Sequence, residues 1–229
     1  MRPGSAMSSA SARSRDASFS PPSGAPPVVF VVDDDVSVRE SLELLIQCAG
    51  WRVETFASAE AFLARPRFLA PSCLVLDVTL PDLNGLEVQR RITANRGDMP
   101  IIFISGYGDV PMTVRAMKAG AIEFLTKPLG DEPLLTAIAE AIARSYTALD
   151  REAYIRTLRE RHALLSPREQ QVMTLVVSGL LNKQVGGELG ISEITVKAHR
   201  GKVMRKMKAA SLADLVKMSA ALGASPGPG

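Results

Sequence analysis

The chain has 229 residues, of which 46% are hydrophobic and 22% are charged, enough apolar material for one large core or two small ones. No run approaches the roughly 18 apolar residues that a membrane helix needs, so we expect a soluble, cytoplasmic protein. Residues 28–150 hold 11 Lys and Arg against 17 Asp and Glu, a charge of −6, whereas residues 151–229 hold 13 against 6, a charge of +7. This asymmetry indicates two domains, of which the basic one is suited to nucleic acid.

Both ends of the chain are predicted to be disordered tails. Residues 1–27 are rich in Ser, Ala, Pro and Arg without apolar periodicity, Met7 is an alternative start, and residues 225–229 are Pro- and Gly-rich. Cys48 and Cys73 lie in apolar stretches with no His nearby, which predicts two reduced, buried thiols rather than a metal site.

Residues 28–150 alternate short apolar runs with helical patterns. Strands are predicted at Val28–Val32, Arg52–Phe56, Cys73–Leu76, Ile101–Ile104 and Ile122–Leu125. Helices are predicted at Val36–Ala49, from Ser58 to Arg65, from an Asn84 cap with Glu87 completing a capping-box-like pair, from Asp109 to Gly120, and from about Glu132. The alternation predicts an α/β fold with a five-stranded, parallel, doubly wound sheet.

Polar side chains follow the predicted strands at the points where the strands end. They are Asp33, Asp34 and Asp35 after the first strand, Asp77 after the third, Ser105 after the fourth and Lys127 after the fifth. The carboxyl ends of parallel strands share one edge of the sheet, where converging carboxylates attract a hard cation such as Mg²⁺. Asp77 is then the natural nucleophile toward phosphorus, with Ser105 and Lys127 stabilising phosphoryl oxygens, whereas Asp35 fits a helix cap.

These motifs resemble the receiver domain of response regulators. They are Val32-Asp33-Asp34-Asp35, Leu76-Asp77, Pro81-Asp82, Gly85, Ser105-Gly106 and Lys127-Pro128, and the stretch Gly106–Ala121 is similar to the FixJ-type branch. The resemblance implies that Asp77 is the phosphoacceptor and that Mg²⁺ is bound by Asp34 directly, by Asp33 mainly through water, by Asp77 and by the Thr79 carbonyl. It also implies a switch pair of Ser105 and Phe124, and a cis Lys127–Pro128 bond with Lys127 as the phosphate partner.

Two aromatic residues near this edge have more than one interpretation. Phe124 is either an ordinary core residue or the switch aromatic, since it lies three residues before Lys127. For Tyr107 our hypothesis is that its ring shields the acyl phosphate from water. No His occurs between Val28 and Arg161, so the phosphoryl group must come from another protein or a small phosphodonor.

The basic part of the chain carries the pattern of a helix-turn-helix domain. The charged stretch Arg151–Arg161 predicts a partly helical linker, and capping signals predict helices from Ser166 to Ser178, at Lys183–Leu189, at Glu193–Lys208 and from Ser211 to about Gly223. A short helix, a tight turn at Gly190 and a longer helix form the helix-turn-helix. We expect Ile194, Val203 and Met207, with Val196 alongside, to face the core and leave a cationic face of Lys197, Arg200, Lys202, Arg205, Lys206 and Lys208 for the major groove.

The C-terminal motifs resemble the LuxR-type DNA-binding domain. They are Leu165-Ser166-Pro167-Arg168-Glu169, Gly179-Leu180, Asn182-Lys183, Leu189-Gly190-Ile191-Ser192 and the run Thr195–Arg200. The resemblance implies that Thr195, Lys197, Ala198, His199 and Arg200 lie near DNA, with Lys202 or Arg205 near phosphates. Two departures are Gly186-Gly187, which predicts an easily frayed helix, and Gly201, which removes a side chain that contacts bases in some relatives.

The two resemblances together predict a phosphorylation-dependent transcription factor and no enzyme. The expected domains are a tail at 1–27, a receiver at 28–148, a helical linker at 149–162, the LuxR-type domain at 163–224 and a tail at 225–229. The implied partners are a sensor histidine kinase, double-stranded DNA with two half-sites, and a second copy of the phosphorylated chain that docks through the receiver, the C-terminal helix or both. RNA polymerase is a further candidate partner, and no membrane is expected.

Two other functions are compatible with parts of the pattern. Haloacid-dehalogenase-type phosphatases also combine an Asp nucleophile with Ser or Thr, Lys and Mg²⁺, but they need a second Asp two residues after the nucleophile, where this chain has Thr79. A DNA-binding protein with a degenerate receiver is the other alternative, against which the intact acidic set and Lys127 argue.

Overall fold

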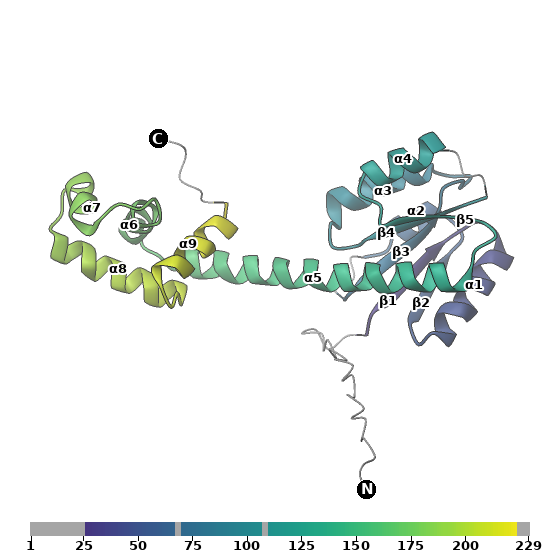
Figure 1. Ribbon diagram of the computed structural model, residues 1–229, viewed down its shortest axis with the longest axis horizontal. Coiled ribbons are helices and arrows are strands. Elements are labelled where there is room, and N and C mark those ends of the chain that lie inside the picture. The colour runs from purple at the N-terminus through teal and green to yellow at the C-terminus, as the bar shows by residue number, and fades with distance from the viewer. Residues whose placement is uncertain (1–25, 67–69, 107–109, 224–229) are drawn as a thin grey trace, which may run out of the picture.

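The computed structural model describes residues 26–66, 70–106 and 110–223 (Figure 1). The predicted tails, apart from Pro26 and Pro27, lie outside the described residues, as do Tyr107 and Asp109. Five parallel strands form one sheet in the order β2-β1-β3-β4-β5. Their bounds are β1 Val28–Val32, β2 Arg52–Phe56, β3 Ser72–Asp77, β4 Ile101–Ser105 and β5 Glu123–Thr126, which confirms all five predicted strands.

Helices cover both faces of this sheet, which confirms the doubly wound α/β fold (Figure 1). On one face lie α1 (Val36–Cys48) and α5 (Asp131–Ala163), and on the other lie α2 (Ala59–Leu63), α3 (Gly85–Asn95) and α4 (Val110–Lys118). Every residue of β1, β3 and β4 is buried, so these strands need apolar side chains on both faces and their sequences are almost continuously apolar.

Two local predictions are wrong. Asn84 caps α3 through the N–H of Leu86, but the Glu87 carboxylate pairs with Arg90 and Arg91 instead of closing a capping box, because residues three and four positions apart are neighbours on a helix surface. Cys48 is exposed rather than buried.

The exposure of Cys48 follows from the helical period, since the buried stripe of α1 contains Leu42 and Ile46 and a residue two positions further along points away from it. Cys73 is buried in β3 as expected, and burial raises the pKa of its thiol.

Helix α5 is a continuous helix of 33 residues, so the segment expected to be a partly helical linker is helical throughout. Its first half buries Leu134, Ile138 and Ile142 against the sheet, and Leu158 near its other end is buried in the core of the C-terminal helices. α5 therefore contributes to two cores and joins the two ends of the molecule (Figure 1). Among the described helices, none is both long enough and apolar enough to cross a bilayer.

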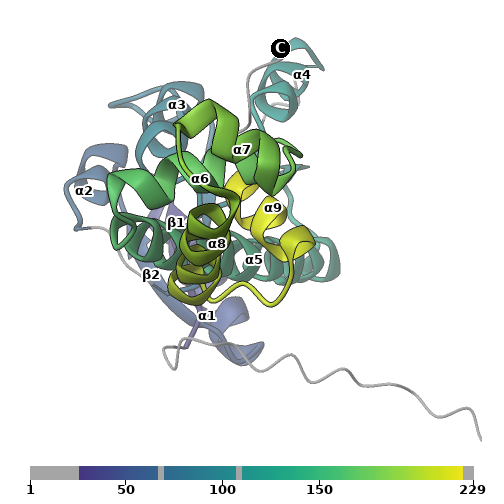
Figure 2. The ribbon, with the colours of Figure 1, turned by 90° about the vertical axis from the view of Figure 1, so that its left-hand side faces the viewer.

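Four short helices follow α5 and lie together in front of the sheet domain in Figure 2. They are α6 (Pro167–Val177), α7 (Asn182–Leu189), α8 (Glu193–Met207) and α9 (Leu212–Ala221). The predicted caps at Ser166, Ser192 and Ser211 are present, the first as a full capping box with Glu169. Gly190 has a left-handed φ of 65° and ends α7, which gives the predicted helix-turn-helix of α7, turn and α8.

The two adjacent glycines of α7 have different surroundings. A Cβ atom on Gly186 would lie 2.7 Å from the carbonyl oxygen of Ile191, whereas one on Gly187 would meet nothing within 4 Å. The missing side chain at Gly186 thus lets the turn pack closely on α7. Only Gly187 costs helix stability without a visible packing gain, by about 1 kcal/mol relative to Ala.

Ile194 does not face the core, and that prediction is wrong. The residue is 80% exposed, whereas Val196, Val203 and Met207 are buried. The three buried residues recur at helical spacing, but Ile194 precedes Val196 by two residues, which is about 200° around the helix. Ile194 therefore lies on the opposite face of α8.

Candidate functional site

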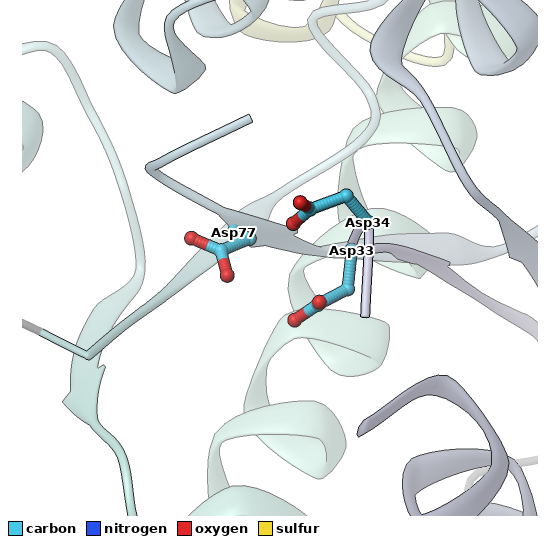
Figure 3. Close-up of side chains that lie close together, drawn as sticks. All are labelled: Asp33, Asp34 and Asp77. Carbon is cyan, nitrogen blue, oxygen red and sulfur yellow. The ribbon is translucent and has the colours of Figure 1, made fainter. Parts of the chain in front are cut away.

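Three carboxylates gather at the carboxyl edge of the sheet. Asp33 and Asp34 directly follow β1, and Asp77 ends the neighbouring strand β3. One oxygen of each carboxylate lies within 4.8 Å of the other two, and Figure 3 shows their positions. Asp33 and Asp77 are buried, whereas Asp34 is exposed. The fold thus brings together the acidic residues that the sequence predicts for one site.

Lys127 partly neutralises this cluster. Its Nζ lies 2.7 Å from Asp33 Oδ2 and 2.6 Å from Asp77 Oδ2. Its main-chain N–H donates to the carbonyl of Ser105 at 2.8 Å, and the Lys127–Pro128 bond is cis as predicted. One ammonium group cannot neutralise three carboxylates, so the site keeps a net negative charge.

Burial and ion pairing shift two pKa values at the site. Burial raises the pKa of Asp33 because it destabilises the anion, and this outweighs the hydrogen bonds from Lys127 and from the Asp35 N–H, which lower it. For Lys127 burial acts to lower the pKa, but the hydrogen bonds and charges of Asp33 and Asp77 outweigh it, so the pKa is raised. Lys127 therefore stays cationic, and the buried Asp33 anion is stabilised by any added positive charge.

The donor atoms of the cluster fit a hard divalent cation. All are carboxylate oxygens, the ligands that Mg²⁺ and Ca²⁺ prefer. The loop that carries Asp33 and Asp34 is held by Arg39, whose Nη1 donates to their main-chain carbonyls at 2.8 and 2.9 Å. Asp77 Oδ1 accepts the N–H of Thr79 at 2.7 Å, which orients the carboxylate.

The other predicted residues lie on the neighbouring strands and in the turns that follow β1 and β3. Ser105 is buried at the end of β4 and pairs in register with Thr126, the residue before Lys127. Phe124 is half-buried against the core, with its ring centroid 6.3 Å from that of Phe103. Thr79 is exposed, and Asp35 caps α1 through the N–H of Ser37 as predicted. The switch role of Ser105 and Phe124 stays a prediction.

The outer face of α8 forms a second candidate site. Of the seven residues predicted to lie near DNA, Lys197, Ala198, Lys202 and Arg205 are exposed. Thr195, His199 and Arg200 are half-buried: the Thr195 hydroxyl lies 2.8 Å from that of Ser192, and Arg200 donates to Asn182 at 3.2 Å. Three of these four exposed residues are cationic, as contact with nucleic acid phosphates requires.

Lys206 does not belong to this outer face, contrary to the prediction. Its Nζ lies 2.6 Å from the buried carboxylate of Glu169 and 3.0 Å from the carbonyl of Leu164. The hydrogen bond from Lys206, with another from the Ser166 N–H, lowers the pKa of Glu169 to about 2. This ion pair fixes α8 to the start of α6 and to the end of α5.

Both parts of the chain match known families. Residues 29–139 match the family described as "Response regulator receiver domain", and residues 163–219 match "Bacterial regulatory proteins, luxR family". Nodulation protein W of Bradyrhizobium diazoefficiens is 50% identical over 198 residues, which are 86% of this chain and 87% of that protein. The chain is a response regulator of the LuxR type.

Other response regulators are similar over the same length. Transcriptional regulatory protein FixJ of Bradyrhizobium diazoefficiens is 42% identical, over 85% of this chain and 95% of that protein. The solved structure of response regulator StyR has a TM-score of 0.73 at 48% identity and covers 86% of this chain and 99% of that one. Full-length FixJ from B. japonicum has a TM-score of 0.52 at 41% identity and covers 87% and 98%. As in this family, the response regulator joins a receiver to a DNA-binding domain of transcriptional regulators.

Sequence reasoning missed three residues that support these sites. Arg39 is separated by several residues from the carbonyls that it binds, and Lys206 pairs with Glu169 across 37 positions. Arg168 donates to the carbonyl of Leu189 and so holds the helix-turn-helix against α6. Of the residues in these contacts, only Glu169, the partner of Lys206, had a recognisable signal in the sequence. Its capping-box position predicts that its carboxylate faces the start of the helix.

We predict that Mg²⁺ stabilises the response regulator through the acidic cluster. When the free Mg²⁺ concentration is ten times the dissociation constant, binding should stabilise the folded protein by about 1.4 kcal/mol. This appears as a rise in the melting temperature when MgCl₂ replaces NaCl at equal ionic strength. Asp34→Asn should lose most of this rise. Asp35→Asn is the matched control, because Asn also caps helices and Asp35 lies outside the cluster. An Asp34→Asn protein that gains as much as wild type contradicts the assignment.

We also predict that Glu169→Gln destabilises the C-terminal domain in a pH-dependent way. The loss at neutral pH should be roughly 1.5–3 kcal/mol, as for hydrogen bonds to charged groups. Because the folded pKa of Glu169 lies below the unfolded value, its contribution is complete above about pH 5 and vanishes as the pH falls toward 2. Urea unfolding followed by circular dichroism measures this, with Trp51 fluorescence reporting the receiver separately. Glu188→Gln is the control, because Glu188 is exposed. If wild type and Glu169→Gln differ in free energy of unfolding by the same amount at pH 2–3 as at neutral pH, the ion pair is refuted.

Proposed function

We propose that a sensor histidine kinase transfers a phosphoryl group to Asp77 and that phosphorylation makes the chain bind DNA as a homodimer. The observation that carries this proposal is the place of Asp77, which ends the central strand inside the acidic cluster with Lys127 Nζ 2.6 Å from its Oδ2. In the transfer, an Asp77 oxygen bonds to phosphorus while the N–P bond of the donor phosphohistidine breaks, and the histidine nitrogen keeps the electron pair.

The residues around Asp77 stabilise the transferred group. Asp33, Asp34, Asp77 and the Thr79 carbonyl would hold a Mg²⁺ ion, which would supply positive charge to the phosphoryl oxygens. Lys127 Nζ already donates a hydrogen bond to Asp77 Oδ2, and after the transfer it donates to a phosphoryl oxygen instead. The Ser105 hydroxyl donates to a second phosphoryl oxygen. The site holds a phosphoryl group and does not turn over a metabolite, since Thr79 stands where a phosphatase of similar chemistry needs an acid.

Movement of Ser105 and Phe124 then changes the surface of α4 and β5. Phe124 is only half-buried and packs further inward when Ser105 moves toward the phosphoryl group. On α4, Val110, Val114 and Met117 are exposed at helical spacing and form an apolar stripe suited to a second copy. α9 is a second candidate interface.

A dimer would place two α8 helices on half-sites about one DNA turn apart. Thr195, Lys197, Ala198, His199 and Arg200, with Lys202 or Arg205 on phosphates, form the proposed contact surface, so affinity should fall steeply with salt. RNA polymerase is a candidate partner of the bound dimer. These partners place the proposed function in the cytoplasm.

Phosphoryl transfer to Asp77 can be followed by the mass of the intact chain. Incubation with acetyl phosphate and Mg²⁺ should add one phosphoryl group to wild type, measured by intact mass, and none to Asp77→Ala. Asp82→Ala is the control, because Asp82 is an exposed carboxylate outside the cluster and its loss should leave the gain intact. A gain that survives in Asp77→Ala, or that does not depend on Mg²⁺, contradicts the proposed site.

A further inference from the structure

Helix α8 exposes a large apolar side chain at its N-terminal end. Ile194 is 80% exposed, more than any other large hydrophobic side chain among the described residues. Single exposed hydrophobic residues are common in proteins, so the exposure alone has little meaning. The position of Ile194 in the fold is what makes it informative.

Ile194 is the second residue of the second helix of the helix-turn-helix. In this motif the N-terminal residues of the second helix reach the base edges of the major groove. The N-terminal end of α8 lies at the end of the molecule away from the receiver (Figure 1), so the described part of the receiver leaves it accessible. Ile194 therefore occupies a position that reads bases rather than phosphates.

The neighbours of Ile194 on this face are small. Ala198 and Gly201 follow it at helical spacing, and both are exposed. Among the described residues, no atom other than those of the adjoining α8 backbone and chain neighbours lies within 4 Å of the place where a Gly201 side chain would begin. A line without bulky side chains lets the α8 backbone approach the base edges closely, which brings the Ile194 methyl groups within reach of them.

Cationic side chains lie on both sides of this apolar line. Lys197 lies on one side and Lys202 on the other, both exposed, while Arg205 is exposed on the line itself, one turn beyond Gly201. Glu193 at the start of the helix pairs with Lys197 at 3.2 Å. An apolar line between cations fits duplex DNA, whose phosphates border a groove that contains apolar groups.

In the major groove the apolar group that a base pair presents is the 5-methyl group of thymine. We propose that Ile194 contacts a thymine 5-methyl group in each half-site and is a specificity-determining residue of the regulator. The inference rests on the proposed DNA binding through α8 and goes beyond it by naming the base that one residue reads.

The test compares thymine with deoxyuridine, which lacks only the methyl group. The full chain, treated with acetyl phosphate and Mg²⁺, is first used to select tight-binding duplexes from a random-sequence pool. Each thymine of the selected duplex is then replaced singly by deoxyuridine, and affinities are measured for wild type and Ile194→Ala. At one thymine per half-site, the replacement should weaken wild type about fourfold, the effect of burying one methyl group, and leave Ile194→Ala unchanged.

Two further variants separate base contact from general effects of truncation. Ile194→Val keeps branched methyl groups and should keep most of the sensitivity to deoxyuridine. Leu164→Ala truncates another exposed aliphatic side chain of the C-terminal domain, one that lies near the C-terminal end of α8 rather than near Ile194. This variant should keep the full sensitivity to deoxyuridine. Because Ile194 is exposed, the melting temperature of Ile194→Ala should equal that of wild type.

The inference is overturned if replacing thymine by deoxyuridine weakens wild type and Ile194→Ala equally at every position. It is also overturned if no replacement weakens binding by wild type. If both proteins still bind the selected duplex with a steep salt dependence in those cases, the DNA-binding function stands and only the thymine contact fails. If neither binds any duplex at low salt, the proposed function fails with it.

Discussion

Asp33 and Asp77 are buried at one edge of the sheet with Asp34 beside them, and their mutual repulsion is the constraint on which the site depends. Burial, and to a smaller extent the charge of Asp77, raises the pKa of Asp33, so the anions persist only where positive charge is supplied. Lys127 supplies part of it by binding two of the three carboxylates. The remaining negative charge favours a divalent cation and, with it, an incoming phosphoryl group. The same electrostatic imbalance thus underlies both the metal binding that we predict and the reactivity proposed for Asp77.

The helix α5 connects this site to the DNA-binding half of the molecule. It packs under the sheet through Leu134, Ile138 and Ile142, and Leu158 completes the core of the C-terminal domain. Arg161 donates to the carbonyl of Met207 at the end of α8, and Lys206 of α8 binds Glu169 and the Leu164 carbonyl. The end of α5 and helix α8 are therefore one packed unit, while the outer face of α8 stays exposed.

Local rules predicted the elements and the acidic site well, because apolar runs, caps and strand-end residues are encoded within a few positions. All five strands, the caps at Ser166, Ser192 and Ser211, and the convergence of Asp33, Asp34 and Asp77 followed from them. Besides the Glu87 capping box, the failures were of two kinds. Ile194 and Cys48 were assigned to cores although the 3.6-residue period places them away from the buried stripes. The contacts of Lys206 with Glu169 and of Arg39 with the Asp33 carbonyl depend on the three-dimensional arrangement, which no local pattern contains.

The central claim is that charge added at Asp77 controls the affinity of α8 for DNA. The most direct measurement is the dissociation constant of the full chain for a selected duplex at fixed salt, with and without acetyl phosphate and Mg²⁺, for wild type and Asp77→Ala. Coupling between two sites is commonly 1–3 kcal/mol, so phosphorylated wild type should bind about tenfold tighter or more than either the untreated protein or the treated variant. Equal affinities in a wild type shown by mass to be phosphorylated would contradict the account.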